Sequence, residues 1–184
     1  MSIKQKVLHV GCGPYNPKKL HPKFQNDAWQ EIRLDINSQF KPDILSDICK
    51  MDQVETGSMD AVYSSHNIEH LFDHEVDMAF QEFLRVLKPE GFAIITCPDL
   101  QAVAECIANG NLDSVLYTSP AGPISPIDIL YGHRASLAKG NYFMAHKTGF
   151  TNHSLGQKLV ASGFKKVKVK CDKKKYDIWA MAYK

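Results

Sequence analysis

Apolar residues along the chain gather in short runs that alternate with stretches of helical periodicity. Five of these runs, read from the sequence, predict β-strands. The strands are expected at Lys6–Val10, Glu31–Asp35, Asp43–Leu45, Met59–Ser64 and Phe92–Thr96. Because strands that alternate with crossover segments form a largely parallel sheet, the pattern predicts an α/β fold.

One crossover has a clear helical stripe of apolar residues at three- and four-residue steps. The stripe consists of Val76, Ala79, Phe80, Phe83, Leu84 and Leu87. Pro89 and Gly91 are expected to end this helix. A second helix is expected after Pro98-Asp99 through Ala108, and a third from a cap at Thr151 or Asn152 to Gly163.

The end of the chain predicts two more strands, Lys165–Cys171 and Tyr176–Tyr183. Only a few residues join them, so they must pair as an antiparallel hairpin. Seven lysines lie between positions 165 and 175. We interpret them as protection of an exposed sheet edge, with a site for a phosphorylated partner as the alternative.

Two segments interrupt the regular alternation. Pro14, Pro17 and Pro22 exclude a long first crossover helix and predict a loop with a short helical turn. The segment Gly110–Phe150 is rich in Gly, Pro, Ser, His and Tyr and has no clean period, which is typical of a lid or substrate wall. With no internal repeat, residues 1–184 are expected to form a single domain that carries this insertion at 110–150.

Composition narrows the protein class. The hydrophobic share of 44% and charged share of 23% are ordinary for a globular protein, and no apolar run reaches the ~18 residues of a membrane span. Five dispersed cysteines and an N-terminus without an apolar signal core predict a cytoplasmic protein with reduced thiols. A net charge of +2 makes nucleic acid an unlikely partner.

The candidate chemistry begins where the first strand ends, at Gly11-Cys12-Gly13. A Gly-x-Gly turn lets a bulky ligand approach the backbone. The second strand ends at Asp35, and a carboxylate there can accept both hydroxyl hydrogens of a ribose. The pair predicts a cofactor that contains a nucleoside.

Seven segments, in order, resemble the class I S-adenosylmethionine-dependent methyltransferases, in particular the small type 11 and type 23 domain group. They are His9–Gly13, Leu34–Ile36, Asp43–Ile48, Met59–Leu71, Glu82–Gly91, Cys97–Leu100 and Lys147–Thr151. The resemblance covers most of the chain. It implies a Rossmann-like sheet, S-adenosylmethionine as cofactor and S-adenosylhomocysteine as product.

The resemblance also implies roles for individual residues. Gly11, Cys12 and Gly13 would let the backbone approach the cofactor, and Asp35 would take the ribose hydroxyls. The adenine would lie against Ile36 and Ile48, with its amino group on Asp47. Ser64, Ser65 and His66 would line the methionine end.

For the acceptor, the sequence predicts a hydroxyl of a small molecule or glycan, because histidines gather near the expected cavity mouth. His66 and His146 are the candidate general bases. Arg134, Tyr131 and His133, on the insertion, are candidate substrate-binding residues. The oligomeric state stays open, with a homodimer among the options.

Two positions depart from the family pattern: His9 stands where an acid is common, and Tyr15 replaces a third glycine. They motivate an alternative function, a cofactor-binding module or partner subunit without catalysis. The lysine cluster motivates a third, RNA methylation. A dehydrogenase is disfavoured because Asn16 occupies the position of its third glycine.

The run His66-Asn67-Ile68-Glu69-His70 matches the H-x-x-E-H pattern of an inverted zinc-protease motif. A strand ends directly before His66, which places that histidine at a turn rather than on a metal-binding helix face. We therefore predict no metal site, and interpret Glu69 and His70 as residues that pack near the sheet edge.

Overall fold

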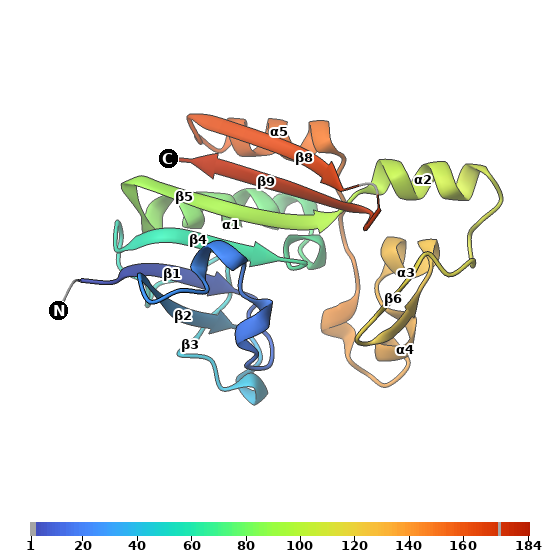
Figure 1. The fold of residues 1–184 in the computed structure, drawn as a ribbon, viewed down its shortest axis with the longest axis horizontal. Coiled ribbons are helices and arrows are strands. Elements are labelled where there is room, and N and C mark those ends of the chain that lie inside the picture. Colours follow the sequence, from blue (N-terminus) through green and yellow to red (C-terminus); the bar gives the residue numbers. More distant parts are fainter. Residues whose placement is uncertain (1–2, 173) are drawn as a thin grey trace.

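The computed structural model describes residues 3–172 and 174–184 and contains a seven-stranded sheet in the order β3-β2-β1-β4-β5-β9-β8 (Figure 1). The strands are β1 Gln5–Val10, β2 Trp29–Asp35, β3 Ile44–Leu45, β4 Met59–Ser65, β5 Leu87–Pro98, β8 Lys166–Asp172 and β9 Asp177–Tyr183. Strands β1 to β5 pair in parallel, and β9 runs antiparallel to both neighbours. The expected Rossmann-like sheet and final hairpin are confirmed.

Helices α1 (Asp73–Val86) and α5 (Asn152–Ala161) lie behind the sheet in Figure 1. Four residues of the predicted stripe, Val76, Ala79, Phe80 and Phe83, are inaccessible to solvent, and Leu84 is partly buried. The helix ends at Val86, earlier than Pro89, because Leu87 already pairs with Met59 of β4. Helix α2 (Leu100–Ala108) begins after an N-cap at Asp99 and α5 after one at Thr151, as expected.

The other face of the sheet has a thinner cover. The first crossover contains only two 3-10 turns, η1 Pro17–Lys19 and η2 Pro22–Phe24, in agreement with its prolines. Leu20 and Phe24 from this crossover pack against Val7, Ala61 and Tyr63 of the sheet. The connection buries apolar area without a full helix.

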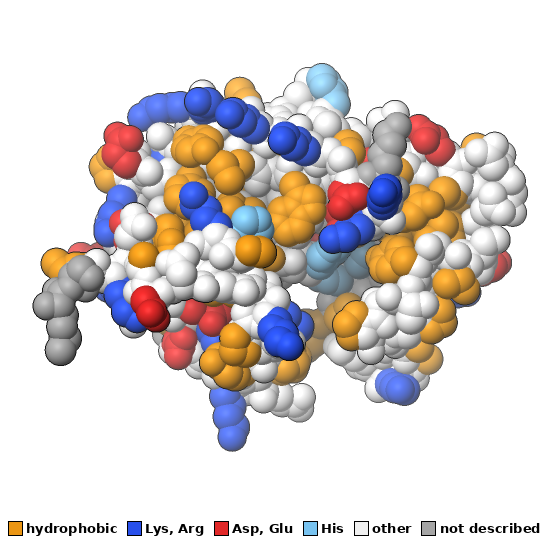
Figure 2. All heavy atoms as spheres, viewed as in Figure 1, with side chains coloured by type: hydrophobic (Ala, Val, Ile, Leu, Met, Phe, Trp, Pro, Cys, Tyr) orange, Lys and Arg blue, Asp and Glu red, His pale blue; other side chains and the backbone are white. Residues whose placement is uncertain are grey.

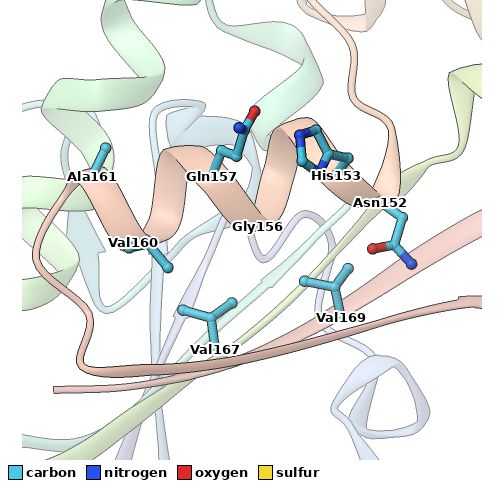
Figure 3. Close-up of a pocket in the computed structure, with 8 residues that line it drawn as sticks. All are labelled: Asn152, His153, Gly156, Gln157, Val160, Ala161, Val167 and Val169. Carbon is cyan, nitrogen blue, oxygen red and sulfur yellow. The ribbon is translucent and has the colours of Figure 1, made fainter.

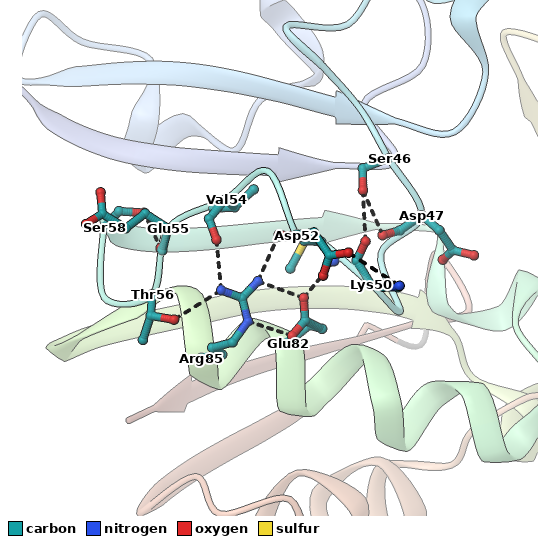
Figure 4. A network of polar contacts seen from close by, with 11 residues as sticks. Ser46, Asp47, Lys50, Asp52, Val54, Glu55, Thr56, Ser58, Glu82 and Arg85 are labelled. Carbon is teal, nitrogen blue, oxygen red and sulfur yellow. Dashed lines mark hydrogen bonds and ion pairs between the residues drawn. The ribbon is translucent and has the colours of Figure 1, made fainter.

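A polar network fixes the segment between β3 and β4 (Figure 4). The Arg85 guanidinium on α1 donates to the backbone oxygens of Val54 and Met51, each at 2.8 Å, and pairs with Glu82 at 2.6 Å. Glu82 in turn accepts the backbone N–H of Met51 at 2.6 Å. These hydrogen bonds hold an irregular loop in one conformation. The neighbouring residues Asp47 and Ile48 are thereby held in place as well.

The insertion lies at the carboxyl end of the parallel strands (Figure 1). Its elements are β6 Tyr117–Ser119, β7 Gly122–Ile124, α3 Pro126–Tyr131, α4 Arg134–Leu137 and η5 Tyr142–Met144. Helix α2 leads into it, and Val103 of that helix forms a small core with Ile124 and Ile129. The expected loop-rich segment therefore consists of short elements around a small core.

The lysines of the final hairpin alternate with valines on the edge strand β8. Lys166, Lys168 and Lys170 are exposed, and Val167 and Val169 are partly buried. A row of basic side chains is visible over β8 in Figure 2. The cluster's Lys173 lies outside the described residues. Among the helices of the described ranges, none is long and apolar enough to cross a membrane.

Candidate cofactor and acceptor site

A cavity of about 840 Å³ opens at the carboxyl edge of the sheet, where β1 and β4 lie side by side. The order of the strands reverses there, and ligands of open α/β sheets bind at such a point. One wall comes from the ends of β1, β2 and β4, and the other from residues 140–144 and 147 of the insertion. Figure 2 shows histidine side chains in the hollow between these two parts.

The glycine turn forms the floor of the cavity. Gly11 and Gly13 both have φ of 60°, a left-handed conformation that favours glycine. A Cβ on Gly11 would also overlap the side chain of Asn67. Cys12 lines the cavity between them, and burial raises the pKa of its thiol to about 11, so the thiol stays protonated at neutral pH.

Asp35 connects the glycine turn to the end of β2. Its Oδ2 accepts the backbone N–H of Gly13 at 2.8 Å, and its Oδ1 accepts that of Asn37 at 2.8 Å. The carboxylate is buried and lines the cavity. Each of its oxygens has a further lone pair, so the site can also accept ribose hydroxyls.

The expected adenine-binding residues lie together at the cavity. Ile36, Asp47 and Ile48 all line it, and Asp47 Oδ1 accepts the backbone N–H of Cys49 at 2.8 Å. Sequence reasoning missed several further residues of this wall. They are Pro14, Lys19, Asn37, Phe40 and Ser46, which lie in irregular segments where no periodicity marks the side chains that face the cavity.

At the end of β4 the expectation for Ser64 needs a correction. Its side chain is fully buried and does not line the cavity, because successive residues of a strand point to opposite faces. The Ser64 hydroxyl has no hydrogen-bond partner among the described residues. Ser65 and His66 do line the cavity.

His66 lies between two carboxylates. Its Nδ1 is 3.5 Å from Glu69 Oε1, and its Nε2 is 3.5 Å from Asp177 Oδ1. Burial opposes a charge here, but the two carboxylates outweigh burial and raise the pKa of His66 to about 10. A protonated imidazole has no lone pair, so His66 can serve as the expected general base only after it releases this proton.

His9, which replaces the family's acid, also lines the cavity. Its Nδ1 is 2.6 Å from Glu31 Oε1 on the adjacent strand β2. The neighbouring strand therefore supplies a carboxylate close to the position where the family pattern has one.

The insertion contributes a different set of residues from the one expected. Tyr131, His133 and Arg134 do not line the cavity. Arg134 instead pairs with Asp128 through Nε at 2.9 Å and donates to Ser125 Oγ at 3.0 Å. Burial disfavours the Asp128 charge, but Arg134 and Ser125 outweigh this and hold the pKa of that carboxyl well below its usual range.

The second wall of the cavity is formed by the η5 segment. Its cavity-lining residues are Gly140, Asn141, Tyr142, Phe143 and Met144, and Lys147 follows. His146 does not line the cavity. Its ring packs against that of His70, with centroids 4.9 Å apart, and His70 does line the cavity.

A second, shallower hollow lies between α5 and β8 (Figure 3). Val160 of the helix and Val167 and Val169 of the strand form its apolar part, and Asn152, His153 and Gln157 its polar rim. Gly156 leaves room here, since a Cβ on it would come within 3.4 Å of Val169. The hollow has no convergent set of ionisable groups, so we assign it no site.

The fold and the main cavity define a Rossmann-like protein that binds a nucleoside cofactor at the carboxyl edge of its sheet. A family model described as a methyltransferase domain matches residues 8–95. These residues contain the glycine turn, Asp35, Asp47 and His66. No curated protein sequence matches the chain significantly.

Solved structures share the fold over the whole chain. A SAM-dependent methyltransferase from Archaeoglobus fulgidus has a TM-score of 0.62 and 17% identity, covering 98% of this chain and 86% of that one. One from Methanosarcina mazei has a TM-score of 0.62 and 15% identity, covering 100% and 94%. The Burkholderia thailandensis 1,6-didemethyltoxoflavin-N1-methyltransferase, solved with S-adenosylhomocysteine, has a TM-score of 0.62 and 14% identity, covering 98% and 71%.

The domain match over residues 8–95 and the fold of the whole chain are consistent with a class I S-adenosylmethionine-dependent methyltransferase. The residues around the main cavity fit S-adenosylmethionine as the cofactor. At such low identities the likeness shows a shared fold. It does not identify the methyl acceptor, because proteins of one fold act on different substrates.

Proposed function

We propose that the enzyme transfers the methyl group of S-adenosylmethionine to a hydroxyl oxygen of a small molecule or glycan. The acceptor binds between the glycine turn and the η5 segment. The observation that carries this proposal is the continuous cavity of about 840 Å³ with a cofactor wall on one side and an acceptor wall on the other. This volume is at the upper end of the ~300–1,000 Å³ typical of ligand sites, which leaves space for both molecules.

On the cofactor wall, Asp35 holds the ribose while Ile36 and Ile48 cover the adenine. Asp47 accepts from the adenine amino group. Gly11, Cys12 and Gly13 lie along the backbone path of the ligand, and Ser65 and His66 face its methionine end. Support comes from their shared position around one cavity at the strand ends.

On the acceptor wall, Tyr142 and Phe143 are 75% and 61% exposed, which is high for aromatic residues. Exposed aromatic faces beside a cavity can stack on a sugar or planar ring. Lys147 adds a cation at the same wall. The chemistry of this wall favours a ring-bearing acceptor with a negatively polarised group.

The protein's main catalytic contribution is alignment. Methyl transfer is an in-line displacement, so the two walls must hold the nucleophile, the methyl carbon and the sulfur on one axis. This alignment can lower the activation free energy by about 7 kcal/mol in favourable cases. A hydroxyl acceptor must also lose its proton. His66 and His146 are the residues whose removal tests this step.

The proposal is tested by a screen of sugars and small hydroxylated metabolites for methylation, with S-adenosylhomocysteine formation as readout. Once an acceptor is found, Tyr142→Ala is compared with Tyr131→Ala, an exposed tyrosine of the same insertion that does not line the cavity. We expect a raised acceptor KM only for Tyr142→Ala. An equal acceptor KM in both variants contradicts the assignment of the acceptor wall.

Cofactor binding without methyl transfer to any acceptor in the screen favours the alternative function, a non-catalytic cofactor-binding module.

If His66→Ala and His146→Ala both leave turnover of that acceptor unchanged, neither histidine takes the proton. This result would overturn the assignment of His66 and His146 as candidate general bases.

A further inference from the structure

The structure brings together three potential metal ligands beside the cavity: Glu69, His70 and His146. Glu69 and His70 belong to η4 (Ile68–His70), which follows the end of β4, and His146 belongs to the insertion. One ligand atom from each lies within 4.8 Å of the others. We propose that this cluster binds a divalent transition-metal ion such as Zn²⁺, and that the ion ties the insertion to the sheet.

Each of the two histidines has a backbone carbonyl partner at Nδ1. His70 Nδ1 is 3.0 Å from the backbone oxygen of Ala145, and His146 Nδ1 is 2.6 Å from that of Ile129. A carbonyl oxygen only accepts, so each Nδ1 carries the hydrogen and each neutral ring keeps its lone pair on Nε2. Ligating histidines commonly donate their second N–H to a backbone carbonyl, which fixes tautomer and ring orientation.

Glu69 supplies the negative charge. The residue is 1% exposed, and neither carboxylate oxygen has a hydrogen-bond partner among the described residues. The His66 ring, 3.5 Å from Oε1, is one cationic neighbour of this carboxylate, and Oε2 has no comparable partner among the described residues. A buried carboxylate oxygen without a partner is costly, so Oε2 favours a second cation such as a metal ion.

Backbone bonds hold the three ligands in place without a metal. The backbone oxygen of Glu69 accepts the N–H groups of Lys147 at 2.9 Å and Thr148 at 3.2 Å. The His146 N–H donates to the backbone oxygen of Tyr131 at 3.2 Å. The site is therefore preorganised on both the η4 side and the insertion side.

The donor set selects the type of metal. Two imidazole nitrogens and one carboxylate match the three-ligand sets of zinc sites that keep an open position, and also suit iron. With metal–ligand bonds of about 2.0–2.2 Å, tetrahedral ligand atoms lie ~3.4 Å apart. The cluster needs only a modest closure from its 4.8 Å limit to reach this spacing. Because His70 also lines the cavity, the ion would lie next to the acceptor space.

Calorimetric titration of untagged, chelator-treated protein with Zn²⁺ tests the proposal. We expect one bound Zn²⁺ per chain and no binding of Mg²⁺, which prefers oxygen ligands. His146→Ala and Glu69→Gln should each weaken Zn²⁺ binding by at least about tenfold, since even residues that only support metal ligands have effects of that size. His153→Ala, which removes an exposed histidine from α5, should bind like the wild type.

A second readout follows the link between insertion and sheet. Zn²⁺ at a hundred times its dissociation constant should raise the unfolding midpoint by about 5–10 °C in the wild type and not in His146→Ala. Retained S-adenosylhomocysteine binding shows that the variant is folded.

Absence of Zn²⁺ binding to the wild type overturns the proposal. So does binding that survives unchanged in both His146→Ala and Glu69→Gln, which would locate the ion at other groups such as the thiols. The titration does not depend on the acceptor, so its outcome is separate from that of the proposed function.

Discussion

The sheet half of the molecule and the insertion at 110–150 are stabilised in different ways. The sheet is built around a large core that includes the fully buried Leu8, Phe80 and Ile95. The insertion's core contains Val103, Ile124 and Ile129, and much of its structure depends on polar contacts such as that of Arg134 with Asp128. The cofactor wall is therefore part of a rigid scaffold, whereas the acceptor wall depends on a few local interactions.

This contrast predicts that a substitution can disrupt one wall of the cavity and leave the other intact. Gly132 is buried, with φ of 96°, and a Cβ would overlap the backbone oxygen of Met144 on the acceptor wall. We expect Gly132→Ala to lower acceptor kcat/KM about 100-fold, or about 2.7 kcal/mol, with unchanged affinity for S-adenosylhomocysteine. Gly110→Ala is the control, since Gly110 also has positive φ, 81°, but nothing lies within 4 Å of its Cβ position and it does not line the cavity. An equal effect of both variants contradicts the steric argument.

Damage to the sheet half should lower global stability. Arg85→Met removes donors from the backbone oxygens of Val54 and Met51 and leaves Glu82 without its partner. We expect the free energy of unfolding to fall by about 2 kcal/mol, measured by chemical denaturation. Lys50→Met, which breaks an ion pair exposed on both sides, should change it by less than about 1 kcal/mol. Similar losses for the two variants would show that the partly buried network adds no more stability than an exposed ion pair.

Within the insertion, Asp128→Asn should loosen α3 and α4 (Arg134–Leu137) while the sheet stays intact. The pKa of Asp128 is held below its usual value, so its stabilising effect is complete above about pH 4 and is lost as the pH falls through the lower value. Because Arg134 is half exposed, we expect a modest effect, about tenfold faster amide exchange over 125–137 at pH 7. Wild type and variant should converge in acid. No difference at pH 7 contradicts the role of this pair.

The smallest effect concerns the adenine end of the cofactor wall. Ile36 is 53% exposed and lines the cavity. Ile36→Ala should weaken S-adenosylhomocysteine binding about fivefold, because roughly 1 kcal/mol of apolar contact is lost. Leu45→Ala is the matched control, since Leu45 is 50% exposed but does not line the cavity. Unchanged binding by Ile36→Ala would place the adenine elsewhere.

The sequence predicts the sheet half well because its signals are local. Apolar runs, proline positions and the N-caps Asp99 and Thr151 act within a few residues. The exception at the end of α1 shows the limit: Leu87 has the helical period, but pairing with β4 makes it the first residue of β5. A strand partner distant in sequence decides that boundary.

The candidate site likewise has one part that the sequence predicts and one part that it does not. The glycine turn and Asp35 are placed by strand ends, which sequence patterns locate. Tyr142 on the acceptor wall belongs to an irregular segment where no periodicity tells which side chain faces the cavity. The grouping of His146 with Glu69 and His70 depends on contacts across some 75 positions of the chain. A local spacing such as H-x-x-E-H carries no information about such contacts.

Calorimetric titration with S-adenosylmethionine and S-adenosylhomocysteine tests the central claim most directly. Asp35 fixes the glycine turn, and its carboxylate would accept hydrogen bonds from the ribose hydroxyls. The wild-type protein should therefore bind both compounds in the micromolar range, and Asp35→Ala should weaken this binding by at least about 100-fold. Asp52→Ala, which removes an exposed acid outside the cavity, should bind normally. Absence of cofactor binding by folded wild type, or unchanged binding by Asp35→Ala, would contradict the assignment of this cavity as the cofactor site.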